Sequence, residues 1–441
     1  MNNINKKVAF YTLGCKVNAY ETNAMIDIFK NNGYDIVDFV EYADVYVVNT
    51  CTVTGMSDKK SRQILRRAKH LNPNSILCAV GCYAQVAKED LEKIEDIDII
   101  LGTVEKKDVL KKVEEFLKTK EAEVDVNNDN KKNSKIVSVD NIMKLMPYKG
   151  YEGIAYTKHA RAEIKIQDGC DRFCSYCIIP YARGPVRSRN PEEILCEIKN
   201  VVNSGVKEIV ITGIHISSYG KDFKENTYSL IDLLEEINNI ENLKRIRLGS
   251  LEPRIITEDF IQRLKKLEKV CNHFHLSLQS GCDETLKRMN RKYTTEEFKK
   301  IVLLLRRNIP EVALTTDVIV GFPGETEEEF KQTEEFLEEI KFSKMHIFKY
   351  SKRKGTPAAT YPNQVTDDKK EERSNILLKM SDMHEKEFAM QYIGKEIEVL
   401  FENATEGHTT NYIKVIREDK NEISEIKFSK AKLWNGEALC I

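Results

Sequence analysis

Residues 168–177 read DGCDRFCSYC, and they directly follow a strand-like run at Ala162–Ile166. Cys170, Cys174 and Cys177 stand in a C-x3-C-x2-C spacing. Thiols this close on one loop converge on a single ion or cluster, and three of them suit a [4Fe-4S] cluster that keeps one iron open. A closed cluster or a structural zinc ion needs four ligands, and the neighbouring sequence offers no fourth Cys or His. Zinc is the weaker alternative, and three unrelated loop cysteines are another.

Five further strand-like runs follow this loop, each separated from the next by a helical pattern. They are Glu208–Ile214, Arg245–Leu248, Phe274–Leu278, Ala313–Val320 and Lys344–Phe348. Together with the first run they predict six βα units curled into a partial, TIM-like (βα)6 barrel over residues 156–376. The cysteine loop then lies at the carboxyl end of the first barrel strand, where barrels of this kind carry their active sites.

The first 118 residues form another region, in which short apolar runs alternate with helical patterns. Its strand-like runs are Val8–Leu13, Val45–Val48, Ile76–Val80 and Ile97–Leu101. The alternation predicts a doubly wound α/β domain with a parallel sheet. Cys15, Cys51 and Cys82 each follow one of the first three runs. Because ligands gather at the carboxyl ends of parallel strands, we expect these thiols to converge at one edge.

Scattered core cysteines are the alternative interpretation of this second triad. Cys78 illustrates the contrast, since it lies inside a strand-like run rather than after one. We assign it to packing, together with Cys196 and Cys440. Cys271 and Cys282 are also expected to be structural, although Cys282 follows a barrel strand.

Two segments complete the chain. Residues 119–155 are rich in Lys, Glu, Asp and Asn and predict a linker, with one strand near Ile136–Val139. A long helical pattern runs from Asp367 to about Tyr392. The short strand-like runs beyond it are Glu396–Phe401, Tyr412–Ile416 and Glu425–Phe428. They predict a small antiparallel β-barrel of OB-like size, and we place this last domain at residues 377–441.

The composition is that of a globular protein, with 41% hydrophobic and 32% charged residues in 441. A net charge of −1 gives no global attraction to nucleic acid, so any such site must come from local patches. We see neither a signal peptide nor a run of about 20 apolar residues, and we expect a cytoplasmic protein without membrane contact. Thiols stay reduced there, which favours metal binding over disulfides for the eleven cysteines.

The cysteine motif at the mouth of a partial barrel resembles the signature of the radical-SAM superfamily. With the strand-end cysteines and the terminal β-barrel, nearly the whole chain resembles the radical-SAM methylthiotransferase family. The resemblance implies two [4Fe-4S] clusters. The barrel cluster binds S-adenosylmethionine and reduces it to a 5'-deoxyadenosyl radical, while an auxiliary cluster on the amino-terminal cysteines carries the sulfur to be transferred. It further implies that a second S-adenosylmethionine methylates that sulfur, and that the terminal domain is a TRAM domain that binds RNA.

Two short segments resemble one branch of the family, the MtaB type. They are GCKVN at Gly14–Asn18 and SKRKGTPAA at Ser351–Ala359. This resemblance implies a tRNA substrate, N6-threonylcarbamoyladenosine at position 37, methylthiolated at C2. Isopentenyladenosine of tRNA and a ribosomal-protein aspartate are alternative substrates, and a non-catalytic, metal-containing RNA-binding protein is the alternative of another class. An electron donor and a sulfur source are implied without being identified, and the sequence leaves the oligomeric state open.

Residues at the ends of the barrel strands are candidates for binding S-adenosylmethionine. Gly213 ends the run VITGIH, where many radical-SAM proteins have a Gly-Gly-Glu motif that this chain lacks, so a plain strand-ending glycine is an alternative. Ser250 and Glu252 in LGSLEPR, and Gln279 in LSLQSG, are placed to contact a ribose or amino group. A turn-forming Ser and a solvated Glu are the simpler alternatives. Asp317 shares this position, and GFPGE resembles the adenine-side turn of the superfamily.

Basic residues cluster in three places that begin at the predicted strand ends. They are Lys59, Lys60, Arg62, Arg66, Arg67, Lys69 and His70 after Cys51, Arg183, Arg187 and Arg189 after the cysteine loop, and Lys349, Lys352, Arg353 and Lys354 after the sixth barrel strand. Their shared position favours contact with an RNA backbone over a merely solvated surface. Acidic residues outnumber basic ones after Gly394, so resemblance alone implies an RNA role there. Tyr412 and Trp434 could stack on bases or pack in the core.

Overall fold

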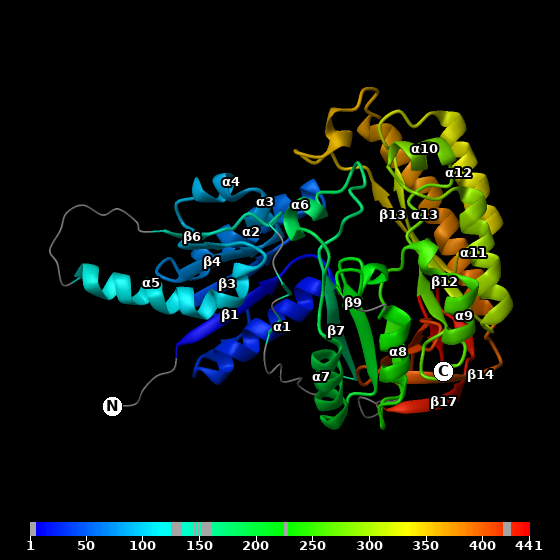
Figure 1. The fold of residues 1–441 in the computed structure, drawn as a ribbon, viewed down its shortest axis with the longest axis horizontal. Helices are drawn as coiled ribbons and strands as arrows, with labels where there is room; N and C mark the ends of the chain where they lie inside the picture. Colours follow the sequence, from blue (N-terminus) through cyan, green and yellow to red (C-terminus); the bar gives the residue numbers. More distant parts are fainter. Residues whose placement is uncertain are drawn as a thin grey trace. The chain divides into compact units, whose positions relative to one another are not determined.

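The structure is a computed structural model that describes residues 6–124, 135–144, 147–148, 150–151, 160–224, 228–417 and 425–441. The chain forms two compact units (Figure 1). The N-terminal unit comprises 1–155, 168–172 and 177–187, and the barrel unit comprises 156–167, 173–176 and 188–441. The expected linker, 119–155, lies partly outside the described residues. The division of the chain into an N-terminal domain, this linker, a barrel and a terminal domain stays a prediction.

The N-terminal unit contains a six-stranded parallel sheet in the order β2-β1-β3-β4-β5-β6. Its strands are β1 (Lys7–Thr12), β2 (Asp35–Val37), β3 (Val45–Thr50), β4 (Ile76–Gly81), β5 (Ile99–Leu101) and β6 (Ile136–Ser138). The strand order reverses direction between β1 and β3, which confirms the doubly wound fold and creates a switch point there. The strand expected near Ile136–Val139 is β6, and it extends this sheet.

Helices cover both faces of the sheet, because its central strands are apolar on both sides. On one face, α1 (Lys16–Asn31) and α5 (Val109–Val124) pack through a core that includes Phe29 and Val113. On the other, α2 (Gly55–Leu71), α3 (Cys82–Val86) and α4 (Lys88–Glu92) pack through Leu65 and Leu91. Cys78 lies fully buried in the first core, as predicted. Ala87 separates α3 from α4, because its backbone is not helical.

Six parallel strands curl into the open barrel of the barrel unit. They are β7 (Arg161–Asp168), β9 (Glu208–Gly213), β10 (Arg245–Leu248), β11 (His273–His275), β12 (Ala313–Val320) and β13 (Lys344–Lys349). They form the sheets β10-β9-β7-β8, with β8 at Arg187–Ser188, and β11-β12-β13. Single bridges, Ile246 to Val270 and Leu251 to Leu276, connect the two sheets. The predicted (βα)6 architecture is thus confirmed.

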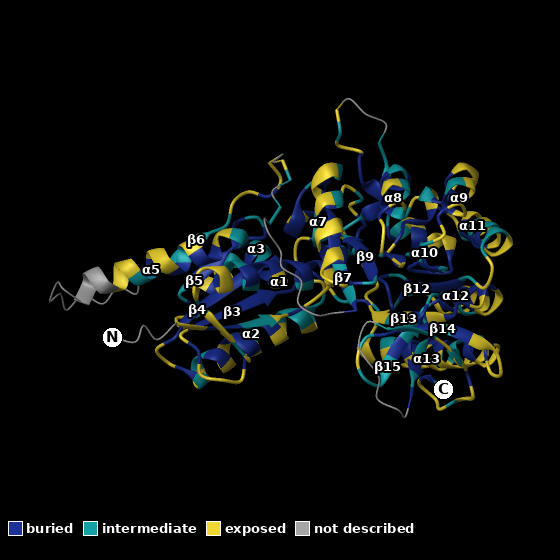
Figure 2. Ribbon diagram, turned by 90° about the horizontal axis from the view of Figure 1, so that it is seen from below, coloured by how far each residue is buried: buried dark blue, intermediate teal, exposed yellow. Residues whose placement is uncertain are grey.

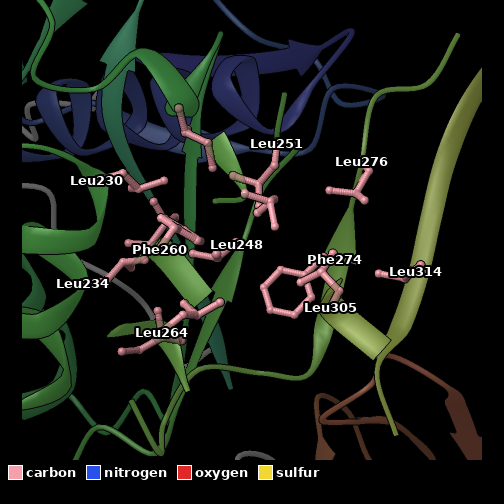
Figure 3. Close-up of a cluster of buried hydrophobic side chains, with 14 of the residues drawn as sticks. Leu230, Leu234, Leu248, Leu251, Phe260, Leu264, Phe274, Leu276, Leu305 and Leu314 are labelled. Carbon is pink, nitrogen blue, oxygen red and sulfur yellow. The ribbon is translucent and has the colours of Figure 1, made fainter. Parts of the chain in front are cut away.

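Outer helices bury alternate residues of every barrel strand. They are α7 (Pro191–Asn203), α8 (Leu230–Asn238), α9 (Glu258–Leu264), α10 (Asp283–Arg288), α11 (Thr295–Asn308), α12 (Glu327–Ile340) and α13 (Asp367–Met390). Figure 3 shows Leu248, Phe274 and Leu314 from the strands against Leu234 and Leu305 from the helices. Figure 2 shows the same division, with buried strands and exposed outer helix faces. Because side chains alternate along a strand, the intervening positions face the lumen, and many of them are polar.

A mostly antiparallel sheet forms the carboxyl-terminal part of the barrel unit. Its strands are β14 (Glu396–Phe401), β15 (Glu406–Thr409), β16 (Lys414–Ile416), β17 (Ile426–Lys430), β18 (Leu433–Trp434) and β19 (Leu439–Cys440). The order is β17-β14-β15-β16-β19-β18, and only the β16/β19 pairing among these described strands is parallel. The curled sheet agrees with the expected TRAM-like module. The strand expected from Tyr412 starts at Lys414, since Tyr412 has a φ of 69°.

The module packs against the amino-terminal ends of the barrel strands. Arg245 Nη2 lies 2.7 Å from Glu398 Oε1, and Arg247 Nη1 donates to Thr410 O at 2.9 Å. The Arg247 guanidinium lies 4.6 Å from the ring centre of Tyr412, and that ring stacks on His408. The Tyr412 ring is therefore engaged in packing. No helix within the described ranges is both long and apolar enough to cross a membrane.

Candidate functional site

The three strand-end cysteines of the N-terminal unit lie at one edge of its sheet. Cys15 follows β1 as the N-cap of α1, Cys51 follows β3, and Cys82 begins α3 directly after β4. These strands are neighbours, so the thiols flank the switch point where such sheets bind ligands. Gly14 has a φ of 103°, and a side chain there would meet Cys51 Sγ at 2.9 Å. The backbone at Gly14 therefore lies close to the Cys51 side chain. Cys15 is exposed, whereas Cys51 and Cys82 are buried.

The donors at this edge are three cysteine thiols, the ligand type that iron-sulfur clusters use. In the part of the chain that the structure describes, no group of three Cys, His, Asp or Glu side chains is arranged to hold one metal ion. Cysteine sulfurs of a four-iron cluster bind different irons and therefore stand farther apart than the ligands of one ion.

A buried charge network lies directly behind Cys82. Arg183 donates from Nε to Cys82 Sγ at 3.2 Å and from Nη1 to Glu21 Oε1 at 2.7 Å. Its Nη1 also lies 3.3 Å from Asp168 Oδ2, and Lys106 pairs with Glu21 from the other side. The side chains of Arg183 and Lys106 have no exposed surface, and that of Glu21 has 1%. All of these residues belong to the N-terminal unit.

Burial and charge oppose each other at these groups. Burial raises the pKa of the Cys82 thiol, while Arg183 and Lys106 counteract it. Burial alone would lower the pKa of Arg183, but Cys82, Glu21 and Asp168 hold that pKa well above its ordinary value. Burial also raises the pKa of Cys51. Arg183 therefore opposes the effect of burial on the pKa of the Cys82 thiol.

The motif cysteines follow β7, and the two units divide them. Cys170 and Cys177 belong to the N-terminal unit, where Cys170 N donates to Gly184 O at 3.0 Å. Gly169 has a φ of 74°, and a side chain there would collide with Pro185 O, so this turn requires glycine. Cys174 belongs to the barrel unit and is buried. Arg291 Nη1 donates to Cys174 Sγ at 3.4 Å, a contact that sequence patterns did not indicate.

The candidates for binding S-adenosylmethionine lie at the carboxyl ends of neighbouring barrel strands. Gly213 ends β9, and a side chain there would lie 3.0 Å from Gln167 O. Ser250 Oγ and Ser277 Oγ are 2.7 Å apart after β10 and β11. Gln279 has a φ of 76°, and its backbone continues the pairing with β12. The structure therefore brings these candidates to one end of the barrel.

Glu252 is the fourth candidate at this end, and its environment excludes the solvated alternative. The residue is buried, with 7% of its surface exposed. Arg254 Nε lies 2.6 Å from its Oε1, and its backbone nitrogen donates to Ser217 Oγ. A buried carboxylate at a strand end is suited to a cationic or hydrogen-bonding ligand.

Two histidines that sequence reasoning did not select, His275 and His346, lie beside Asp317 in the lumen. His275 on β11 lies 3.3 Å from Asp317 Oδ2 through its Nε2. The rings of His275 and His346 are 5.8 Å apart, and burial lowers the pKa of His346 while Asp317 opposes that shift. Period-two alternation along β11 and β12 was the signal that could have identified this cluster.

The helix α2 presents a basic surface after Cys51. Lys59, Arg62, Arg66, Arg67 and His70 line a hollow of about 890 Å³. Lys59, Lys60, Arg66 and Arg67 are exposed, and among the described residues no carboxylate pairs with them. Arg62 instead donates to Tyr83 Oη at 2.6 Å, and Lys69 pairs with Asp98. The exposed members are therefore available to a polyanion.

Four of the other expected RNA contacts are buried, which corrects the sequence-based interpretation for them, whereas Lys349, Lys352 and Lys354 are exposed. Arg183, Arg187 and Arg189 have 0%, 6% and 5% of their surface exposed. Arg187 pairs with Asp168 and Arg189 with Glu197. Arg353 is also buried, at 8% exposure. The charges of these four arginines are therefore not exposed to solvent.

Family models match two parts of the chain. Residues 164–337 match the Radical SAM superfamily, and residues 7–102 match Uncharacterized protein family UPF0004. The first match covers the barrel strands from β7 to β12. The second covers the sheet edge with Cys15, Cys51 and Cys82.

Curated relatives match almost the full length. The chain is 45% identical to Threonylcarbamoyladenosine tRNA methylthiotransferase MtaB of Bacillus subtilis, over 93% of this chain and 90% of the relative. It is 34% identical to tRNA-2-methylthio-N(6)-dimethylallyladenosine synthase of Thermoanaerobacter, over 96% and 90%. Among solved structures, the radical S-adenosylmethionine methyltransferase TsrM of Kitasatospora setae shares the fold, with a TM-score of 0.54 at 16% identity over 80% of this chain and 75% of that one.

Removing the carboxylate at the centre of the buried network should destabilise the N-terminal unit. Glu21→Gln leaves Lys106 without its counter-charge and weakens that of Arg183, which costs about 3 to 5 kcal/mol for a buried pair. Hydrogen exchange followed by mass spectrometry should show faster exchange in β1 and α1 peptides. Glu115→Gln, which removes an exposed partner of Lys112 in the same unit, serves as the control and should exchange like the wild type. Equal protection in both variants would contradict the expected role of Glu21.

Proposed function

The chain belongs to the radical-SAM methylthiotransferase family, and on this premise we propose that it converts N6-threonylcarbamoyladenosine of tRNA to its 2-methylthio derivative. The main support for this substrate is sequence identity. The chain is 45% identical to the threonylcarbamoyladenosine enzyme and 34% identical to the dimethylallyladenosine enzyme. The segments GCKVN and SKRKGTPAA support the same branch. The target carbon has an unreactive C–H bond, which acid-base groups alone could not functionalise.

Two cysteine triads would hold two [4Fe-4S] clusters in this proposal. Cys170, Cys174 and Cys177 would hold the barrel cluster, and the triad of Cys15, Cys51 and Cys82 would hold the auxiliary one. When bound, these groups supply the electron that cleaves S-adenosylmethionine and the sulfur that is inserted. The support is the motif spacing in the first case and the shared sheet edge in the second.

The protein's own groups would prepare the auxiliary thiols for this role. Metal ligation requires thiolates, and burial disfavours a charge on Cys82. Arg183 offsets that cost through its contact with Cys82 Sγ, and Glu21 keeps the guanidinium in place. Gly14 allows the close approach to Cys51.

At the barrel's strand ends, Gly213, Ser250, Glu252 and Gln279 would bind S-adenosylmethionine. The hydroxyl pair formed by Ser250 and Ser277 can donate to or accept from a ribose. The carboxylate of Glu252 can accept from an amino group. Gly213 leaves space beside the strand end where a larger residue would meet Gln167.

The exposed basic face of α2 would contact the tRNA backbone. It follows Cys51 directly in the chain, and Lys59, Lys60, Arg66 and Arg67 offer charges that no described carboxylate neutralises. Arg62 would contribute less because Tyr83 holds it. Arg353 would not contribute, since it is buried. A low-potential electron donor and a sulfur source must also take part.

Product analysis tests the substrate. A strain that lacks this gene should lose 2-methylthio-N6-threonylcarbamoyladenosine from its tRNA digest and accumulate the unthiolated nucleoside in mass spectrometry. It should keep any methylthio-isopentenyladenosine and any methylthio-aspartate on the ribosome. If the threonylcarbamoyl product persists while one of the others disappears, the proposed substrate is wrong. The protein would still be a methylthiotransferase.

Iron content tests the two clusters. Anaerobically reconstituted protein should bind about eight irons, and replacement of Cys170, Cys174 and Cys177 with Ala should leave about four and abolish cleavage of S-adenosylmethionine. The control is Cys196→Ala, an exposed cysteine on α7, which should keep about eight. Loss of all iron in the triple variant would rule out two independent sites. Structural zinc in place of iron and labile sulfide would favour the non-catalytic alternative.

Charge reversal on α2 tests the RNA surface. Arg66→Glu with Arg67→Glu should weaken tRNA binding and flatten its dependence on salt by roughly one unit of slope per lost phosphate contact. Iron content should not change. The matched control reverses Lys300 and Lys331, two exposed lysines of the barrel unit, and so alters the net charge equally. Equal loss of affinity in both double variants would assign the effect to net charge alone.

A further inference from the structure

Arg291 has an unusual set of partners in the barrel unit. Its Nη1 donates to Cys174 Sγ at 3.4 Å, its Nη2 donates to Ser277 O at 2.9 Å, and its Nε donates to Tyr293 Oη at 2.9 Å. Ser277 is the residue whose hydroxyl contacts Ser250. The guanidinium is thus fixed by the backbone at the end of β11 and directed at one cysteine sulfur.

The charge of Arg291 has no carboxylate partner among the described residues. The neighbours that favour its charged form are Tyr293, Tyr176 and Cys174. Two other arginines provide the contrast. Arg288, three residues earlier, forms a bidentate pair with Glu329, at 2.9 Å and 2.5 Å. Arg183 contacts Cys82 but is also paired with Glu21 and Asp168. A thiolate at Cys174 would therefore be the counter-charge of Arg291.

We infer that Arg291 is a positioning residue that holds the Cys174 sulfur and makes the barrel cluster easier to reduce. The inference rests on the proposed function, because it requires a cluster on Cys174. Hydrogen bonds to cluster sulfurs and local charge are two of the factors that set the reduction potential of such a cluster. Reduction adds one negative charge, so a nearby cation that no carboxylate neutralises stabilises the reduced form more than the oxidised form.

The electron balance of this step is simple. One electron from a low-potential reductant converts the oxidised cluster to the reduced one, and no bond at Arg291 or Cys174 is made or broken. In turnover the same electron passes to S-adenosylmethionine, whose sulfur–C5' bond breaks to give methionine and the 5'-deoxyadenosyl radical. Arg291 changes the equilibrium of the first transfer without touching the reacting atoms.

Redox titration with dithionite, followed by electron paramagnetic resonance, tests the inference on the full chain. A background with Cys15, Cys51 and Cys82 replaced by Ala isolates the barrel cluster. In it, Arg291→Gln should lower the ratio of reduced to oxidised cluster at a fixed potential about tenfold, which for one electron is a shift of about 59 mV to more negative values. Arg291→Lys keeps the positive charge but loses the planar guanidinium with its several hydrogen-bond donors. It should show a smaller shift in the same direction.

The control is Arg288→Gln, whose charge is already neutralised by Glu329, and it should titrate like the parent. An unchanged midpoint in Arg291→Gln overturns the inference, as does an equal shift in Arg288→Gln. If Arg291→Gln does not take up a cluster, Arg291→Lys decides: a negative shift supports the inference and an unchanged midpoint overturns it. A parent protein that assembles no paramagnetic cluster would instead refute the proposed barrel cluster, so the two failures are distinguishable.

Discussion

The N-terminal unit depends on the requirement that a fully buried guanidinium must be neutralised. Arg183 lies at the end of the short segment that begins with Cys177, yet its side chain is enclosed by groups from the first strand-helix pair and from Cys82. Removing any one anion from such a site leaves an uncompensated charge in a medium of low dielectric. The position of that segment is therefore fixed by electrostatics as much as by packing, and so is the environment of the Cys82 sulfur.

Strand direction provides the second constraint on the chemistry. Every pairing in the N-terminal sheet is parallel, and so are the ladders of the barrel. Parallel strands end at the same edge, so residues far apart in the chain, such as Cys15 and Cys82, come to one side without any local signal between them. The same rule places Gly213, Ser250 and Gln279 together at one end of the barrel. Helices then cover the remaining faces, and their outer sides are exposed (Figure 2).

Sequence patterns predicted the parts of the molecule that depend on local periodicity. The bounds of β10, β12 and β14 agree with the runs chosen from the sequence. Short strands with weak patterns were missed, such as β2 and β15, because three or four partly polar residues carry little period-two signal. Roles that depend on neighbours from distant segments could not be predicted. A run of arginines looks alike whether its charges face solvent or, as for Arg183 and Arg189, internal carboxylates.

The junction between the barrel and its terminal module limits how this protein could have diversified. Arg247 is shared: it forms a bidentate pair with Glu208 inside the barrel and also donates to the backbone carbonyls of Thr409 and Thr410. A module exchanged between relatives must bring carbonyls and a ring equivalent to Tyr412 to the same place, or the barrel's arginines lose partners they cannot replace with water. We therefore expect a terminal module to be exchangeable only where it offers equivalent partners to Arg247.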